Sequence, residues 1–237
     1  MNFIKPTFSI IIATILFTYS AKAQVYFDAY QLLHSEEPKI GVGLHGGTNA
    51  SAMDFGMKGD GYQVGIHGEF TPIRFLSLNI GLSKGELKGG PVVLEDNNGM
   101  KKAEFKTNFF QGAAVVRFMP FRIWMWDNVS PVAEFFTYIY GGLGLGYFNY
   151  ETIATDFVGQ EYGALGKSKE SSAVFIQELG IDLPIVKLNE RSKLFLNFNY
   201  RFNKVNSDAV DGYKPTVASN EHKDVYSSYN IGVTFKF

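Results

Sequence analysis

Most of the chain alternates between apolar and polar positions. The last eleven residues, SSYNIGVTFKF, place apolar side chains at Tyr229, Ile231, Val233, Phe235 and Phe237, with polar or small residues between them. Seven earlier segments share this alternation: Lys39–Asn49, Gly61–Phe70, Phe75–Ser83, Phe105–Met119, Pro131–Tyr150, Ala173–Pro184 and Lys193–Asn203. A period of two gives a β-strand with one apolar and one polar face. The pattern therefore predicts eight strands.

The length of the segments and their aromatic ends indicate which way the apolar faces point. Strands of soluble sheets usually run about five or six residues, whereas membrane-spanning strands need about 9 to 11. The alternating segments have the longer size, and aromatic residues gather near their ends, as membrane interfaces favour. These residues are Tyr62, Phe70, Phe118, Phe121, Trp124, Trp126, Tyr147, Tyr200 and Phe237. We therefore expect the apolar faces to meet lipid.

The polar faces carry charges of both signs. The residues concerned are Glu69, Arg117, Glu134, Glu178, Asp182, Arg201 and Lys236. A barrel of about eight strands has an interior just wide enough for side chains to fill. We predict that these side chains form a mutually paired network in the lumen of an all-β, eight-stranded, antiparallel, up-and-down transmembrane barrel.

The connections alternate between compact and long, as in barrels with short turns on one side and long loops on the other. The compact ones are residues 71–74, 120–130 and 184–192, and the long polar ones are 50–60, 84–104, 151–172 and 204–224. Within the second long connection, Pro91–Glu95 (PVVLE) has strand character. If it formed an extra hairpin, the barrel would have ten strands and a narrow channel, so eight strands or ten remains open.

The start of the chain has the features of a cleavable secretory signal. Lys5 precedes an apolar run over residues 8–19 and a small-residue site at 21–23, and the run is shorter than the roughly 20 residues that span a bilayer. We expect a signal peptide at 1–23, a periplasmic lead at 24–38 and the barrel at 39–237. The chain has no cysteine, and its net charge of −1 gives no field for nucleic acid.

With its terminal aromatic and the apolar residues at every second position before it, the chain resembles the OmpA/OmpX type of small porin-like outer-membrane β-barrels. The resemblance implies a location in the outer membrane of a Gram-negative bacterium, among lipid and lipopolysaccharide. It also implies that the barrel-assembly machinery reads Tyr229, Ile231, Val233, Phe235 and Phe237 as an assembly signal. The long loops would then be extracellular.

Candidate chemistry is sparse. His45 and His67 fall on the polar faces of the first two segments, with Glu69 two residues further on, and such groups can bind a metal. We favour a hydrogen-bond network there and predict no cofactor. In the last long connection, His222 stands near Ser219, Glu221 and Asp224, but the mere composition of a polar loop is no catalytic triad.

We therefore predict a non-enzymatic outer-membrane protein with a structural role, a role in binding through its loops, or a place as subunit of an envelope complex. Two alternatives stay open. One is a narrow porin or channel, and the other is an enzyme that modifies the acyl chains of lipopolysaccharide.

Overall fold

The structure is a computed structural model that describes residues 39–52, 58–96, 99–124, 130–155, 167–189, 192–207, 209–211 and 224–237. The predicted signal peptide and periplasmic lead, residues 1–38, lie outside this part of the chain. Within the described residues, no helix is long and apolar enough to cross a membrane.

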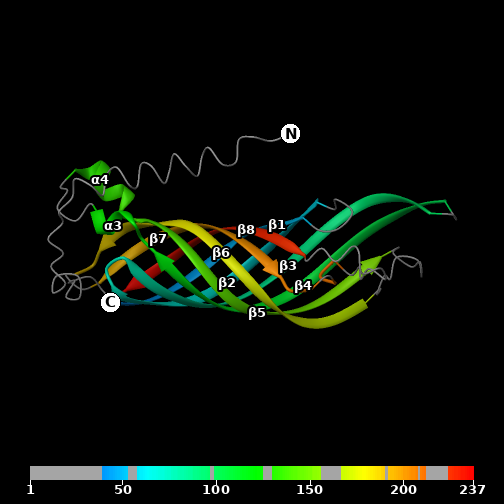
Figure 1. The fold of residues 1–237 in the computed structure, drawn as a ribbon, viewed down its shortest axis with the longest axis horizontal. Helices are drawn as coiled ribbons and strands as arrows, with labels where there is room; N and C mark the ends of the chain where they lie inside the picture. The colour runs from blue at the N-terminus through cyan, green and yellow to red at the C-terminus, as the bar shows by residue number, and fades with distance from the viewer. Residues whose placement is uncertain are drawn as a thin grey trace. The chain divides into compact units, whose positions relative to one another are not determined.

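The described strands form a closed barrel, shown in Figure 1. The strands are β1 (Ile40–Ala52), β2 (Lys58–Ile73), β3 (Leu76–Asp96), β4 (Gly99–Phe118), β5 (Ile139–Thr155), β6 (Lys167–Lys187), β7 (Lys193–Val205) and β8 (Val225–Lys236). Each pairs antiparallel with the next, and β8 pairs with β1. The predicted eight-stranded, up-and-down barrel is confirmed. The ten-stranded alternative is wrong, because Pro91–Glu95 lengthens β3 and adds no strand of its own.

The two ends of the described barrel meet at the seam between β1 and β8. The backbone N–H of Phe237 donates to the carbonyl of Ile40 at 2.8 Å, and the N–H of Ile40 donates back to Phe237 at 3.3 Å. A sheet in hydrocarbon must leave no edge unpaired, and these bonds complete the ring. The five apolar residues at the end of the chain all lie on the outer face of β8 or just beyond it.

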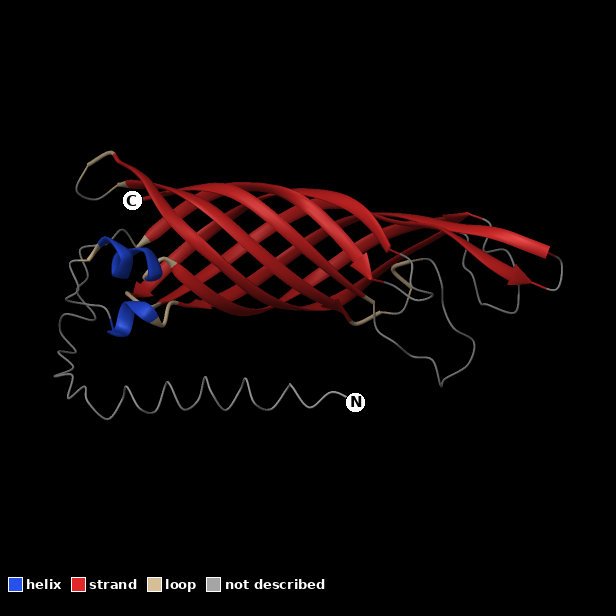
Figure 2. Cartoon of the chain, turned by 90° about the horizontal axis from the view of Figure 1, so that it is seen from above, coloured by secondary structure: helices blue, strands red, loops and turns tan. Residues whose placement is uncertain are grey.

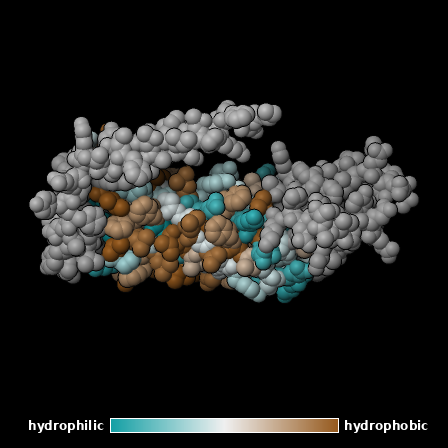
Figure 3. All heavy atoms as spheres, in the orientation of Figure 1, coloured by the Kyte–Doolittle hydropathy of each residue, from teal (hydrophilic) through white to brown (hydrophobic). Residues whose placement is uncertain are grey.

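The outer face of the barrel is apolar and the inner face is largely polar. Leu145 and Leu44 are 67% and 65% exposed, whereas Arg117 and Glu69 are 2% and 3% exposed. On the visible face in Figure 3, hydrophobic residues gather over the part of the barrel nearer the helices, and hydrophilic ones gather toward the opposite end. Many exposed apolar side chains on the outer face of the strands are what the lipid-facing surface of a membrane barrel requires.

One end of the barrel carries two short helices, α3 (Phe121–Trp124) and α4 (Pro131–Phe136), and we call it the helix end. At the other, which we call the hairpin end, β3 and β4 project beyond their neighbours (Figure 2). Pairing of β2 with β3 stops at Tyr62 and Glu86, whereas β3 and β4 remain paired out to Asp96 and Gly99. The prediction of a loop over 84–104 is therefore wrong, since these residues are almost all strand.

The β2-side edge of this projecting hairpin is blunted. Side chains of β1 reach past β2 to backbone carbonyls of β3. The Asn49 amide donates to the carbonyl of Glu86 at 3.3 Å, and the Ser51 hydroxyl donates to the carbonyl of Lys88 at 2.9 Å. The register then shifts between Gly89 and Val92, where Gly90 has a positive φ of 100°. Pro91 follows and lacks a backbone N–H. Bulges and prolines of this kind discourage pairing with another chain.

The segment Pro131–Tyr150, predicted as one strand, is a helix followed by a strand. Pro131 stands in the first turn of α4, where its missing N–H costs no hydrogen bond, and β5 begins only at Ile139. Residues 151–172, predicted as a loop, also belong partly to strands, because β5 runs to Thr155 and β6 begins at Lys167.

Candidate functional site

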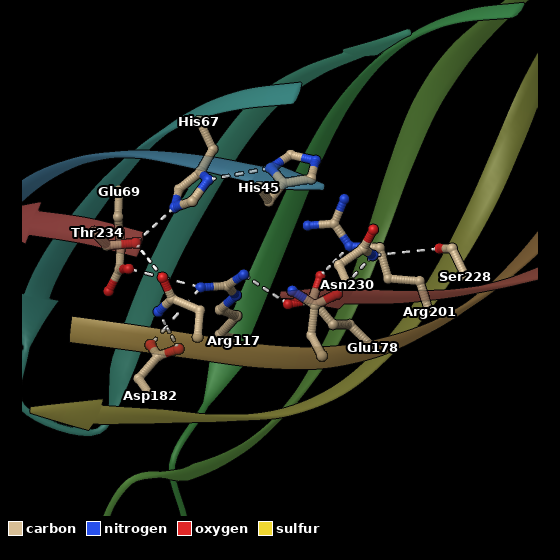
Figure 4. A network of polar contacts seen from close by, with 12 residues as sticks. His45, His67, Glu69, Arg117, Glu178, Asp182, Arg201, Ser228, Asn230 and Thr234 are labelled. Carbon is tan, nitrogen blue, oxygen red and sulfur yellow. Dashed lines mark hydrogen bonds and ion pairs between the residues drawn. The ribbon is translucent and has the colours of Figure 1, made fainter. Parts of the chain in front are cut away.

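The lumen near the helix end holds a network of buried ion pairs centred on Arg117 of β4 (Figure 4). Arg117 Nη2 lies 2.6 Å from Glu178 Oε1, and Arg117 Nη1 lies 3.6 Å from Glu69 and 3.9 Å from Asp182. Arg201 Nε donates to Glu178 Oε2 at 2.6 Å. These carboxylates come from β2 and β6, on either side of Arg117, so the network ties the barrel walls together across the lumen.

Lys236 of β8 completes the network. Its Nζ lies 2.5 Å from Glu69 Oε1 and 3.9 Å from Asp182 Oδ2. The network therefore contains three cations and three carboxylates. Two rings add to it, with Lys236 4.8 Å from the centre of Phe195 and Arg117 4.4 Å from the centre of Tyr140. Buried charges demand pairing of this sort, because an unpaired one is costly.

The structure brings six of the seven predicted lumen residues together and leaves Glu134 out. Glu134 belongs to α4, where it is exposed and accepts a hydrogen bond from the Tyr138 hydroxyl at 2.7 Å. The prediction for Glu134 is wrong, because it assumed a strand where Pro131 starts a helix. Sequence reasoning also missed Phe195 and the pairing of Tyr140 with Arg117. Phe195 and Tyr140 both fall on the inward face of their strands by the same alternation. The alternation could therefore have identified them as lumen residues.

Large lumen side chains lie over glycines of the neighbouring strand. Arg117 is paired with Gly142, and Tyr140 is paired with Gly180. A Cβ at Gly180 would lie 2.4 Å from the Tyr140 hydroxyl, so a side chain there would displace the ring. The row of glycines in β5 and its neighbours thus makes room for the large residues of the network.

The two predicted histidines follow the same rule. His45 is paired with Gly65 and His67 with Gly43, and each ring lies where a Cβ on the paired glycine would come within 2.6 Å of it. The two Nδ1 atoms lie 3.4 Å apart. Both histidines lie on the inner face, as their polar-face positions predicted, and they are diagonal neighbours across β1 and β2.

A chain of hydrogen bonds leads from the ion network to the histidines. The Asn197 amide donates to Asp182 at 2.6 Å, and the Thr234 hydroxyl donates to Asn197 Oδ1, also at 2.6 Å. The Thr234 oxygen then accepts from His67 Nε2, at 2.9 Å. In a neutral His67 this leaves Nδ1 as the acceptor, so His45 Nδ1–H is the donor of the last bond. The chain fixes the tautomers of both rings.

This arrangement does not bring His45, His67 and Glu69 together as a metal site. Glu69 turns toward Lys236 and Arg117, away from the histidines. Among the residues that the structure describes, no group of three or more His, Cys, Asp or Glu side chains has the arrangement of a metal site. His45 and His67 remain as a pair of hydrogen-bonded rings.

Above the ion network, toward the hairpin end, the lumen is filled by amides and then by aromatic rings. Gln63 donates to Asn230 at 2.6 Å, and Tyr226 donates to Gln111 at 2.9 Å. Beyond them the ring of Phe148 lies 5.0 Å from that of Phe109 and 5.6 Å from that of Tyr226, centre to centre. This part of the lumen is apolar, unlike the charged network nearer the helix end. The three rings are buried and pack against one another inside the barrel.

A short segment between β7 and β8, Ala209–Asp211, lies inside the barrel above the rings. All three residues are at most 2% exposed. The carbonyl of Val210 accepts hydrogen bonds from the hydroxyls of Thr107 and Thr152, and its N–H donates to Asp224 at 2.7 Å. Of the four loop residues considered as a catalytic group, Asp224 therefore accepts a hydrogen bond from this segment. Ser219, Glu221 and His222 lie outside the described residues.

A closed ring of eight strands, an apolar exterior and a side-chain-filled polar and aromatic interior together define an integral outer-membrane β-barrel protein. This confirms the fold implied by the resemblance to the OmpA/OmpX type. No family model matches the sequence, and no curated protein matches it significantly.

Several solved structures resemble the chain. Neisserial surface protein A is 16% identical, with a TM-score of 0.46, over 84% of this chain and 97% of its own. The attachment invasion locus protein Ail of Yersinia pestis is 12% identical, with a TM-score of 0.42, over 85% and 99%. The outer membrane protein OprG from Pseudomonas aeruginosa is 16% identical, with a TM-score of 0.43, over 86% and 99%. These values are too low to support an inference about function, and the fold assignment rests on the strand pairing described above.

Proposed function

We propose that the protein is a non-enzymatic outer-membrane barrel of a Gram-negative bacterium whose closed body carries a projecting surface hairpin for binding. The observation that carries this proposal is the filling of the lumen by the ion network, the amides, the stacked rings and the Ala209–Asp211 segment. A barrel filled in this way leaves its outer surfaces and loops as the places where function resides.

The projecting β3–β4 hairpin supports binding through side chains. It offers a paired two-stranded platform, and its blunted edge does not favour addition of a strand from a partner. On its surface, Lys88 and Lys106 both pair with Glu86 at 2.6 Å, which orders the side chains at its base. In the cell, the hairpin end would be extracellular and the helix end periplasmic.

Planar-bilayer recording of the purified protein tests the closed lumen. The wild-type protein is expected to give no stepwise conductance. Regular conductance steps would overturn the proposal in favour of a narrow channel. Intact-mass analysis of lipid A from a strain lacking the protein tests the enzyme alternative, and an altered acyl pattern would favour it.

The proposed orientation has its own test, because the chain contains no cysteine and single-cysteine variants are therefore unambiguous. Lys88→Cys at the hairpin and Lys187→Cys at the helix end both replace exposed residues. On intact cells, a membrane-impermeant maleimide should label the first and spare the second until the outer membrane is permeabilised. The reverse result would show that the helix end is extracellular and the hairpin end periplasmic. Native gels after mild detergent extraction then decide between a monomer and a subunit of an envelope complex.

A further inference from the structure

The α4 helix presents an apolar face that nothing in the described part of the chain covers. Val132, Phe135 and Phe136 are 68%, 47% and 38% exposed, while Ala133 is buried. Residues three and four apart lie on the same side of a helix, so these three side chains form one surface. We call it the α4 face.

The α4 face is held firmly in place. The buried guanidinium of Arg122 donates to the carbonyl of Thr137, just after α4, at 3.0 Å, and to the carbonyl of Arg74, in the β2–β3 turn, at 3.1 Å. The rings of Phe121 and Phe136 lie 5.7 Å apart, centre to centre. Arg122 therefore ties both short helices to the rim of the barrel, and the apolar face does not belong to a loose connection.

The α4 face continues the lipid-facing wall of the barrel. Phe135 lines the same shallow exterior groove as Ile139, Leu179 and Ile181, which are outward residues of β5 and β6. At the same end, Phe70, Phe118 and Phe237 also point outward, each between 43% and 50% exposed, as an aromatic belt at a membrane interface would. A water-soluble partner covering Phe135 would have to enter the lipid beside these strands.

We propose that the α4 face is a membrane-binding surface that lies in the interface of the leaflet at the helix end, with Phe135 against the acyl chains of phospholipids. Short apolar helix faces of this kind bury themselves at the boundary between headgroups and chains. The helix lies in the connection between β4 and β5, and its apolar face thus widens the aromatic belt there. The occupant of the face is a lipid surface, and no other protein is required.

Tryptophan fluorescence in vesicles of phosphatidylcholine tests the proposal. The two native tryptophans, Trp124 and Trp126, are replaced by phenylalanine, and single reporters are introduced as Phe135→Trp and Val132→Trp. Glu134→Trp is the matched control, because Glu134 lies in the same helix but outside the apolar face. Slower migration after boiling than before confirms for each variant that the barrel has folded.

With phosphatidylcholine brominated on its acyl chains, the reporters at positions 135 and 132 are expected to lose more emission than the reporter at 134, and to emit at shorter wavelength. Acrylamide added to the water should quench in the opposite order. The proposal is overturned if all three folded variants emit as water-exposed tryptophan and ignore the bromine. That result would leave the α4 face open to a protein partner.

Discussion

Glu178 of β6 and Arg201 of β7 are directly paired across neighbouring strands, and their side chains form a 2.6 Å ion pair inside the barrel. Glu178 also holds Arg117 at the same distance, so one carboxylate serves two buried cations. Removing one partner of a buried pair leaves an uncompensated charge, whereas removing both can be nearly neutral. The network is therefore most sensitive to single substitutions.

Glu178→Gln should lower the free energy of unfolding by about 3 to 5 kcal/mol, because Arg117 and Arg201 lose their shared carboxylate. Urea titration of the protein in lipid vesicles measures this loss. Combining Glu178→Gln with Arg201→Gln should recover part of it, since the two residues are coupled. Glu134→Gln is the control and should change little, because Glu134 is exposed on α4. A loss below about 1 kcal/mol for Glu178→Gln would contradict the paired network.

If the outer face meets lipid, an arginine placed on it should lower the stability of the barrel more than an arginine on a water-exposed surface would. Leu145 is 67% exposed, and in a water-soluble protein replacing such a residue by arginine changes stability by only about 0.5 kcal/mol. In a bilayer, Leu145→Arg should cost about 2 to 4 kcal/mol if the residue lies near the midplane. Asp60→Arg, at an exposed position toward the hairpin end of β2, should be tolerated. Equal effects of the two substitutions in vesicle refolding would refute the facing of the barrel.

Glycines opposite large lumen residues should tolerate no side chain, whereas an outward glycine should. A Cβ at Gly43 would lie 2.5 Å from the His67 ring, but a Cβ at Gly141 has nothing within 4 Å. Overpacking typically costs about 1 to 3 kcal/mol, so we expect a loss of this size for Gly43→Ala and none for Gly141→Ala. Adding His67→Ala to Gly43→Ala should restore part of the stability. Failure of this rescue would show that the histidine is not the obstacle.

These pairings also show what the sequence could and could not predict. Alternation placed Arg117, Glu178 and Arg201 on one face, because a strand has only two faces and the apolar residues occupy the other. It could not predict which glycine lies opposite which side chain, since that depends on the register between strands. The distances within the network depend on the same register.

Two wrong predictions, for Glu134 and for residues 84–104, come from the same rule of apolar and polar alternation. The loose alternation of PVAEFF predicts a strand with Glu134 in the lumen, yet Pro131 in a first helical turn outweighs so short a pattern. The sequence of residues 84–104 predicts a loop, because a strand outside the membrane has no reason to carry an apolar face. The glycines, lysines and glutamates there do not alternate with apolar residues, so the pattern does not reveal the strand that pairing with β4 stabilises.

Phe237 provides a test that separates assembly in the cell from stability of the barrel. The residue is 50% exposed, and its backbone closes the seam with Ile40 through two hydrogen bonds. If the terminal aromatic is also the signal that the assembly machinery reads, Phe237→Ala should lower the amount of folded protein in the outer membrane. The substitution keeps the backbone bonds, so unfolding of the purified variant in vesicles should change by no more than the loss of one lipid-exposed ring. Phe237→Tyr, which keeps an aromatic ring, should assemble normally. Normal outer-membrane levels of Phe237→Ala would leave the residue a structural role only.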